Sequence, residues 1–266
     1  MALDATSERL AARRWPEPDP DPAGASDAGA VVAVHGFAQS RDCLGPMGDA
    51  IAARHQLTAV DAPGHGGSAL HADADLWRGA ELLVATGGAA SYLGYSMGGR
   101  LCLHAALAAP ESVERLVLVS CTAGIEEDRA RAERVDWDEQ HAARLEEIGL
   151  EAFVEEWLAQ SLFAGLPSWA RFDEERRGNS VEGLAASLRR AGTGSMEPLW
   201  DRLPEIGCPV LVVTGSRDER YGELGARMAA TIGANAHHVV VPGAGHSAHL
   251  ERPSQTTAAV LEFLAA

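Results

Sequence analysis

The pentapeptide Gly94-Tyr95-Ser96-Met97-Gly98 ends a short apolar run and opens a segment typical of a helix. A serine on such a strand-to-helix turn adopts a strained backbone conformation that exposes its hydroxyl at the carboxyl edge of the sheet. The small residues Gly94 and Gly98 let the turn close without side-chain collisions. Ser96 is therefore the first candidate for chemistry, on a predicted nucleophile elbow.

Such a serine needs a general base, and the base needs a carboxylate that orients it. In one known arrangement the acid follows the serine along the chain and the histidine comes last. Asp218 comes just after the apolar run 209–214, and His246 lies on a glycine-rich loop after the apolar run 238–241. Because the carboxyl ends of parallel strands meet at one edge of a sheet, we predict a triad of both residues with Ser96.

Two simpler interpretations remain open. Asp218 could cap a helix predicted over residues 221–231, because aspartate is a preferred N-cap residue. His246 could be a loop histidine without a partner, although Gly243 and Gly245 flank it. The positions of the two side chains relative to each other and to the serine distinguish these interpretations from a triad.

An oxygen that gains negative charge during a reaction needs fixed hydrogen-bond donors. At an elbow one donor is the next backbone amide, here that of Met97, and the second comes from a loop after an early strand. Residues 31–34 predict that strand and His35-Gly36-Phe37 follows it, so we assign the second amide to Phe37. His35 could carry a proton, but a histidine beside such a loop more often bonds the backbone and shapes the turn.

Apolar runs position these candidates. Strands are predicted at residues 31–34, 57–61, 91–95, 113–120, 209–214 and 238–241. Strands of this length that alternate with helical segments indicate right-handed β-α-β units and a mainly parallel sheet. A buried helix is predicted over residues 97–109, behind the elbow, and an amphipathic helix over residues 254–264. The pattern predicts the α/β class.

The pattern changes within residues 124–198, where charged runs with apolar residues at helical spacing replace the strand signals. One apolar stripe consists of Leu150, Phe153, Val154, Trp157, Leu158 and Leu162. We predict a helical cap over residues 124–198, packed by this stripe onto a core of residues 30–123 and 199–266. Residues 1–29 are acidic and proline-rich, and we predict a flexible lead or a surface wrap there.

The chain has 266 residues and a net charge of −16. This charge argues against nucleic acid or an anionic membrane as a partner, since both need a basic face. No apolar segment predicts a membrane span or a secretory signal, so we expect a cytoplasmic protein. The scattered cysteines lack metal-ligand spacing and are predicted to be reduced thiols, three of them in or beside apolar runs. They are Cys43, Cys102, Cys121 and Cys208.

Every basic side chain is an arginine, because the sequence contains no lysine. Arginine binds carboxylates in a bidentate manner. Arg100 comes one helical turn after Ser96, so it could bind an anionic substrate beside the serine. It could equally form an ion pair on the helix surface.

Several segments together resemble a known family. Residues 61–66, 94–100 and 244–251 carry the resemblance in the core, and residues 192–200 are similar to a Gly-Thr-Gly-x-Gln-Pro-x-Leu-Trp signature in the cap. The chain thereby resembles, from about residue 31 to its end, the 2-succinyl-6-hydroxy-2,4-cyclohexadiene-1-carboxylate synthases of menaquinone biosynthesis. This family implies an α/β-hydrolase fold with a helical cap.

The resemblance implies a lyase that eliminates pyruvate from 2-succinyl-5-enolpyruvyl-6-hydroxy-3-cyclohexene-1-carboxylate. Ser96, polarised by His246 and held by Asp218, would remove a ring proton. The amides of Phe37 and Met97 would stabilise the developing oxyanion. No metal or organic cofactor is needed, because conjugation and the oxyanion hole stabilise the carbanion.

The resemblance also implies substrate-binding residues. They are Tyr95, Arg100, Arg131 or Arg134, Trp157 and Arg176. The signature departs from the family at Glu197, where a glutamine is expected, and a negative charge there would weaken the binding of an anion. The implied partner is a small anionic carboxylate, bound by a monomer or a small homo-oligomer.

Two other functions remain open. A serine hydrolase of esters, thioesters or carbon–carbon bonds would use the same triad to form an acyl-enzyme. A ligand-binding protein on this fold could retain the site without turnover. Convergent arginines in the cap would favour an anionic substrate, whereas an apolar cap would favour a neutral ester.

Overall fold

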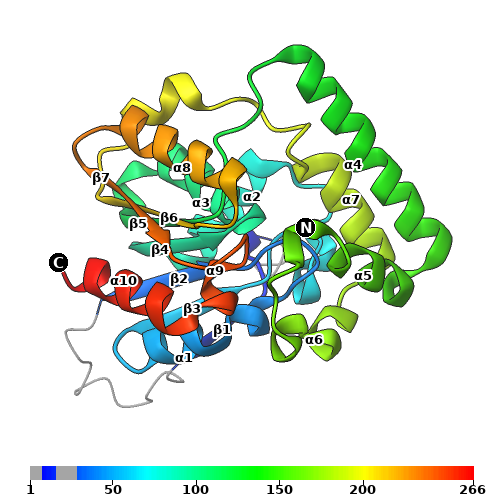
Figure 1. Ribbon diagram of the computed structural model, residues 1–266, viewed down its shortest axis with the longest axis horizontal. Coiled ribbons are helices and arrows are strands. Elements are labelled where there is room, and N and C mark those ends of the chain that lie inside the picture. The colour runs from blue at the N-terminus through cyan, green and yellow to red at the C-terminus, as the bar shows by residue number, and fades with distance from the viewer. Residues whose placement is uncertain (1–7, 16–28) are drawn as a thin grey trace, which may run out of the picture.

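The computed structural model describes residues 8–15 and 29–266. A seven-stranded sheet forms its centre, with the strand order β1-β3-β2-β4-β5-β6-β7 (Figure 1). The strands are β1 (Ala12–Trp15), β2 (Ala30–Val34), β3 (Gln56–Val60), β4 (Ala90–Tyr95), β5 (Val113–Val119), β6 (Val210–Gly215) and β7 (Ala236–Val241). β1 runs antiparallel to β3, and all other neighbours are parallel. The predicted parallel strands and the α/β class are confirmed.

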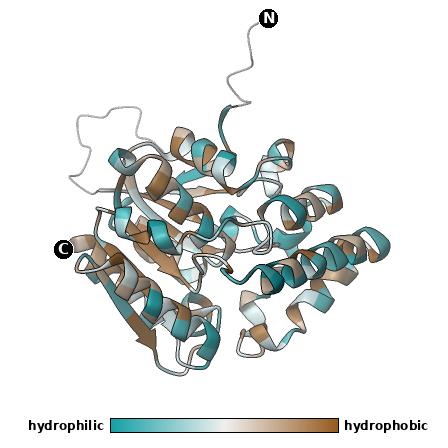
Figure 2. Ribbon diagram, turned by 90° about the horizontal axis from the view of Figure 1, so that it is seen from above, coloured by the Kyte–Doolittle hydropathy of each residue, from teal (hydrophilic) through white to brown (hydrophobic). Residues whose placement is uncertain are grey.

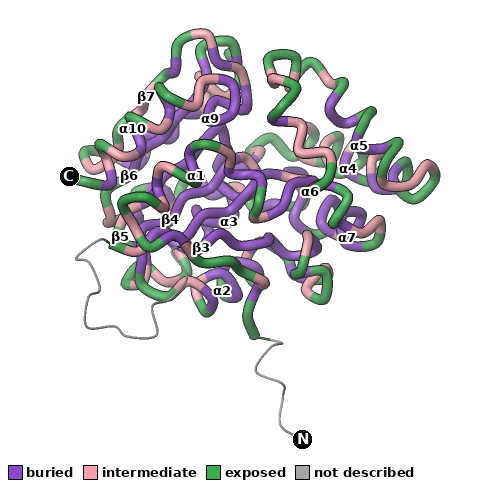
Figure 3. The backbone as a smooth tube through the Cα atoms, turned by 90° about the horizontal axis from the view of Figure 1, so that it is seen from below, coloured by how far each residue is buried: buried purple, intermediate pink, exposed green. Residues whose placement is uncertain are grey.

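Both faces of the sheet are covered by helices. The core helices are α1 (Gly45–Ala52), α2 (Leu76–Gly87), α3 (Met97–Ala108), α8 (Glu219–Ile232), α9 (Ala248–Glu251) and α10 (Pro253–Ala265). Side chains of α2, α3 and α8 pack on one face of the sheet, and those of α1, α9 and α10 pack on the other. Figure 3 shows the consequence, a largely buried set of central strands inside a more exposed helical layer.

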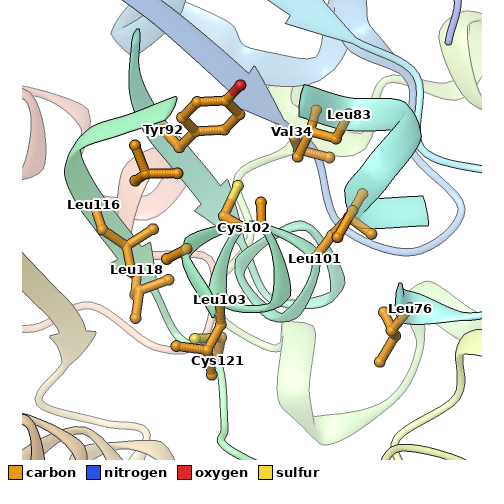
Figure 4. Close-up of a cluster of buried hydrophobic side chains, with 14 of the residues drawn as sticks. Val34, Leu76, Leu83, Tyr92, Leu101, Cys102, Leu103, Leu116, Leu118 and Cys121 are labelled. Atoms are coloured by element: carbon orange, nitrogen blue, oxygen red, sulfur yellow. The ribbon is translucent and has the colours of Figure 1, made fainter. Parts of the chain in front are cut away.

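Successive side chains of a strand point to opposite faces of the sheet, so one apolar run contributes to the core on both faces. In β2, Val32 and Val34 belong to the cluster under α3, whereas Val31 and Ala33 belong to the cluster under α1 and α10. Figure 4 shows the first cluster, in which side chains of α3 meet Tyr92 of the sheet. A strand buried on both faces must be apolar throughout, which is why the sequence marks these strands clearly.

Four more helices lie together beside the sheet, at the right of Figure 1. They are α4 (Asp128–Ile148), α5 (Leu150–Leu158), α6 (Asp173–Arg177) and α7 (Val181–Ala191). The long helix α4 is mostly hydrophilic (Figure 2), while Phe153 and Trp157 of α5 and Leu184 of α7 form an apolar cluster that includes Ala38 of the core. We propose that residues 124–198, which contain these helices, form a cap.

The lead predicted over residues 1–29 differs from the structure at β1. Ala12–Trp15 pairs antiparallel with Leu57–Val60 at the sheet edge. An edge strand gains its stability from backbone hydrogen bonds and needs no apolar run, so the short segment gave no strand signal. Leu10 is buried beside it, and its amide donates to the hydroxyl of Thr86 at 2.8 Å. The rest of the predicted lead, residues 1–7 and 16–28, lies outside the described residues.

The cysteines occupy apolar surroundings. Cys43, Cys102 and Cys121 are buried free thiols, and Cys208 is partly exposed. Burial raises the pKa of Cys43 to about 11 and that of Cys121 to about 12, which keeps both thiols protonated at neutral pH. Over the part of the chain that the structure describes, no helix combines the length and apolar character that a membrane crossing requires.

Candidate active site

The turn from β4 into α3 places the serine. Ser96 has a φ of 52° and a ψ of −109°, a conformation that L residues rarely adopt. A Cβ on Gly94 would lie 2.2 Å from the carbonyl oxygen of Gly98, and a Cβ on Gly98 would lie 2.4 Å from that of Val34. Larger residues at these two positions would push the turn away from the sheet, so the glycines permit the strained serine.

A histidine and an aspartate from two other loops meet Ser96. The Nε2 atom of His246 lies 3.1 Å from Ser96 Oγ, and its Nδ1 atom lies 2.7 Å from Asp218 Oδ2. The other oxygen of Asp218 accepts the amide of Tyr221 at 3.3 Å and caps α8. The two interpretations of Asp218, as the N-cap of a helix and as a triad member, are therefore compatible, because each uses a different oxygen of the carboxylate.

The loop that carries His246 is fixed by a buried carboxylate. Glu251 accepts the amide of Gly245 at 2.7 Å and that of Ser247 at 3.1 Å, so it binds the backbone on both sides of the histidine. The Ser247 hydroxyl shares a 2.7 Å hydrogen bond with the Tyr95 hydroxyl. These bonds set the direction in which the imidazole leaves the backbone.

We expect Glu251→Gln to lower kcat by about tenfold and to change KM little. The amide keeps the size of the side chain, but its NH₂ group faces a backbone amide, so one of the two bonds is lost. Activity assays and thermal unfolding measure the effect, with the exposed Glu262→Gln as the matched control. If kcat follows only the fraction of folded protein, Glu251 supports the fold and does not position His246.

Two backbone amides beside the serine have no acceptor within residues 8–15 and 29–266. The amide of Gly36 donates to Gln39 Oε1 at 2.9 Å, and that of Ala38 donates to His65 Nε2 at 3.2 Å. The amide of Phe37, between them, donates to no group among the described residues, and neither does that of Met97. Both residues line the same cavity as Ser96, so the arrangement can serve as an oxyanion hole.

His35 holds the loop and does not reach the cavity. Its Nε2 atom accepts the amide of Ala62 at 3.1 Å, so its Nδ1–H donates to the carbonyl oxygen of Gly36 at 2.7 Å. His65 bonds in the same way to Pro63 and Ala38. Both rings are neutral in this pattern, and the geometry fits the structural role predicted for His35.

The free energy of unfolding is expected to fall as the pH drops from about 7 to about 5. Burial lowers the pKa of His35 to about 4 and that of His65 to about 3. Below about pH 6.5 the unfolded chain binds protons that the folded protein excludes, and each histidine costs up to about 1.4 kcal/mol per pH unit. We expect urea unfolding at several pH values to show a weaker dependence of the free energy of unfolding on pH for His35→Gln than for the wild type. The exposed His237→Gln is the control and should match the wild type. Equal pH dependence in all three proteins would contradict the assignment.

Ser96 opens into a cavity of about 540 Å³ between the core and helices α4 to α7. Its walls include Phe37, Met97 and His246 from the core and Trp157 from α5. Within residues 8–15 and 29–266, no group of three histidine, cysteine or acidic side chains is arranged to hold a metal ion. The charged or basic groups of the cavity wall are four arginines, three carboxylates and His246. The arginines are Arg100, Arg134, Arg176 and Arg220, and the carboxylates are Glu133, Asp138 and Asp218.

Arg100 is one of these arginines. Its side chain is buried, and its NH1 group donates to the carbonyl oxygen of Ala191 at 2.6 Å. Among the described residues it forms no salt bridge, so the alternative of a surface ion pair is wrong. Burial, and then the charge of Arg134, lower its pKa to about 10, so the guanidinium stays charged at neutral pH.

Arg176 reaches the cavity from α6. It is 2% exposed, and its guanidinium donates to the carbonyl oxygens of Arg171 at 2.6 Å and Ala38 at 2.9 Å. No carboxylate pairs with it in the described part of the chain. Burial lowers its pKa. A buried cation without an anionic partner is costly, which points to an anion supplied from outside the protein.

Of the two candidates in α4, only Arg134 lines the cavity. It pairs with Asp138 at 2.9 Å, and Asp138 also accepts the amide of Gly194 at 3.1 Å. Arg131 instead pairs with Asp128 and donates to the carbonyl oxygen of Ile125 at the start of the helix. The structure therefore leaves Arg131 outside the site, because a nearer surface carboxylate holds it.

The two predicted aromatic residues both contribute walls. Tyr95 lines the cavity, but its hydroxyl is committed to Ser247, so its ring is the part that faces a ligand. The Trp157 ring lies 4.8 Å from that of Phe37, and its buried Nε1 has no partner among the described residues. Trp157 thus both packs the cap and lines the cavity.

Glu197 does not contact the site. Its side chain is exposed and is absent from the cavity walls, whereas Gly192 and Thr193 of the same segment line them. The backbone of residues 197–198 packs on Gly124. The pKa of Arg202 is raised mainly by its hydrogen bond to Glu205, and the charge of Glu197 adds to this rise. The expected weakening of anion binding by Glu197 therefore has no structural basis.

Some cavity residues were not predicted. Arg220 and Tyr221 line it from the first turn of α8, and Gln39, Gln160 and Ser187 line it from other segments. Arg220 and Tyr221 follow the predicted Asp218 directly, and this adjacency was the signal available in the sequence. The helix predicted over residues 221–231 accounted for Tyr221 as an ordinary helical residue, and Arg220 lay outside every predicted element.

Comparison with known proteins gives consistent matches. Residues 31–260 match the family described as the alpha/beta hydrolase family. A Bacillus subtilis protein named as a 2-succinyl-6-hydroxy-2,4-cyclohexadiene-1-carboxylate synthase is 38% identical over 65% of this chain, and the match spans 64% of that protein, less than two thirds of its length. The synthase of that name from Salmonella paratyphi A is 32% identical over 91% of this chain and 96% of its own. The solved structure of MenH from S. aureus superposes with a TM-score of 0.82 and 27% identity, over 96% of this chain and 97% of that one.

Proposed function

The chain belongs to the α/β hydrolase family and, within it, to the 2-succinyl-6-hydroxy-2,4-cyclohexadiene-1-carboxylate synthases, and we propose that it eliminates pyruvate from 2-succinyl-5-enolpyruvyl-6-hydroxy-3-cyclohexene-1-carboxylate. One observation carries the proposal. Arg100 and Arg176 are buried without carboxylate partners among the described residues, in the cavity that holds the Ser96–His246 pair. A substrate with several carboxylates would supply the missing anions.

In the proposed reaction Ser96 acts as the base. Its Oγ takes a proton from the ring carbon while His246 Nε2 accepts the serine proton, and Asp218 stabilises the imidazolium that forms. The electron pair of the broken C–H bond moves through the ring, and the C–O bond to the enolpyruvyl group breaks. Pyruvate leaves as its enolate and then takes up a proton. The amides of Phe37 and Met97 donate to the substrate carbonyl oxygen as it gains charge.

A serine hydrolase is the second candidate. The 3.1 Å distance from His246 Nε2 to Ser96 Oγ and the two unpaired amides also suit attack on an acyl carbon. The substrate class distinguishes the two functions. A neutral ester has no use for several arginines in one cavity, so the walls favour the lyase.

The test is pyruvate release from the enzymatically generated substrate by the purified full chain, with p-nitrophenyl acetate assayed in parallel. Pyruvate formation well above the spontaneous rate, with negligible ester cleavage, supports the lyase. Pyruvate at the spontaneous rate with fast ester cleavage would refute it in favour of the hydrolase. The absence of both activities would indicate a ligand-binding protein.

A further inference from the structure

The first turn of α8 presents a phenol to the cavity. Tyr221 lies three residues after Asp218, and its ring centroid is 4.5 Å from that of His246. The residue lines the cavity, and its hydroxyl has no hydrogen bond to any group in the described part of the chain. A hydroxyl beside the reacting groups is therefore left for a ligand, while its backbone amide serves the triad aspartate.

Three arginines line the same cavity as this phenol. Arg220, the residue before it, lines the same cavity and forms no salt bridge among the described residues. Arg134 and Arg100 line the cavity from α4 and α3. Burial raises the pKa of Tyr221 and outweighs the charges of these three arginines, which lower it, and the charge of Asp218 adds to the rise. The hydroxyl thus remains a proton donor at neutral pH, in a cavity whose walls carry these arginines together with Glu133, Asp138 and Asp218.

Arg176 forms a separate cationic group. It is bound to the loop after β2 through Ala38, whereas Arg100 is bound to Ala191 of α7 and Arg134 to Asp138 of α4. The cavity therefore has two cationic regions, and Ser96 lines the same space. Such a cavity suits a ligand with at least two carboxylates that are not adjacent.

We propose that Tyr221 and Arg220 form, with Arg134 and Arg100, a subsite that binds one of the two carboxylates that the product retains, the succinyl or the ring carboxylate, and that the Tyr221 hydroxyl donates a hydrogen bond to it. The inference rests on the proposed function, whose substrate carries three carboxylates, in its succinyl, enolpyruvyl and ring substituents. Tyr221 and Arg220 then determine specificity, because they distinguish an acid from an ester or amide at this end of the cavity.

Calorimetric binding to the full-length protein tests the subsite independently of turnover. The probe is 2-succinylbenzoate, a stable aromatic dicarboxylate with the succinyl and ring carboxylates of the product. Two monocarboxylates, 2-butanoylbenzoate and 4-oxo-4-phenylbutanoate, each retain one of these groups. The variants are Tyr221→Phe, which keeps the ring against His246, and Arg220→Gln. Arg217→Gln is the control, because it removes the same charge from an exposed neighbour that does not line this cavity.

Each of the two variants is expected to raise the Kd of the dicarboxylate about tenfold, equivalent to about 1.4 kcal/mol. Each should also weaken one monocarboxylate and spare the other, and Arg217→Gln should stay within about twofold of the wild type. Four results would overturn the subsite. Two of them are wild-type affinity in Tyr221→Phe and an equal loss of affinity for all three probes. The other two are an equal loss of affinity in Arg217→Gln and Arg220→Gln, and no binding of the dicarboxylate by the wild type. If these binding results hold but the wild type releases no pyruvate, the proposed lyase fails and the subsite stands.

Discussion

Ser96→Ala is expected to lower kcat for pyruvate release by about 1,000-fold or more, with the fold unchanged. The proposed reaction passes its proton through Ser96 Oγ, which lies 3.1 Å from His246 Nε2. Alanine leaves the imidazole in place but removes the atom that reaches the substrate carbon. The remaining rate would come from the arginines and the two amides, which bind and polarise the substrate without a base.

The fold should tolerate this substitution. Serine and alanine meet the same steric strain at a φ of 52°, because both carry a Cβ and no branch. The Ser96 amide bonds to the carbonyl oxygen of Val119, which the substitution preserves. Circular dichroism and thermal unfolding check this point, with the exposed Ser254→Ala as the activity control. Wild-type turnover in a folded Ser96→Ala protein would remove the serine from the mechanism.

The core of this fold was predictable because its strands are buried on both faces. β2, for example, is buried from Val31 to Val34 and consists of apolar residues only, as such an environment favours. The elbow, Asp218 and His246 were predictable for a related reason. Each follows the carboxyl end of a predicted strand of the parallel sheet, so a pattern local in the sequence marks a shared position in space.

The features that were not predicted depend on where side chains and chain segments point in space, which the sequence does not show directly. Arg131 and Arg134 are three residues apart on one helix, and the partners Asp128 and Asp138 decide which of them faces the cavity. Arg220 lines the cavity only because α8 begins at its edge. β1 was not predicted because its stability comes from pairing with the backbone of β3, where each partner, such as Leu57 for Trp15, lies more than 40 positions away in the sequence.

Arg100→Ala is expected to raise KM for the carboxylate substrate by about tenfold to a hundredfold and to change cleavage of a neutral ester little. The side chain is buried in the cavity wall and stays charged. A substrate carboxylate that loses this guanidinium loses a charge-assisted hydrogen bond in a water-poor site. A neutral ester makes no such bond, so its KM is insensitive to the charge. Steady-state kinetics with both substrates measure the difference, and Arg131→Ala, outside the cavity, is the control.

The comparison between substrates matters because Arg100 also has a structural contact. Its NH1 group donates to the carbonyl oxygen of Ala191, the last residue of α7, at 2.6 Å. Truncation therefore removes an anchor for the cap together with a positive charge. A displaced α7 would alter the cavity for every ligand and impair both substrates alike. Equal losses would assign Arg100 to holding the cap, whereas a selective loss with the acid would assign it to binding the anion, in agreement with its lack of a carboxylate partner among the described residues.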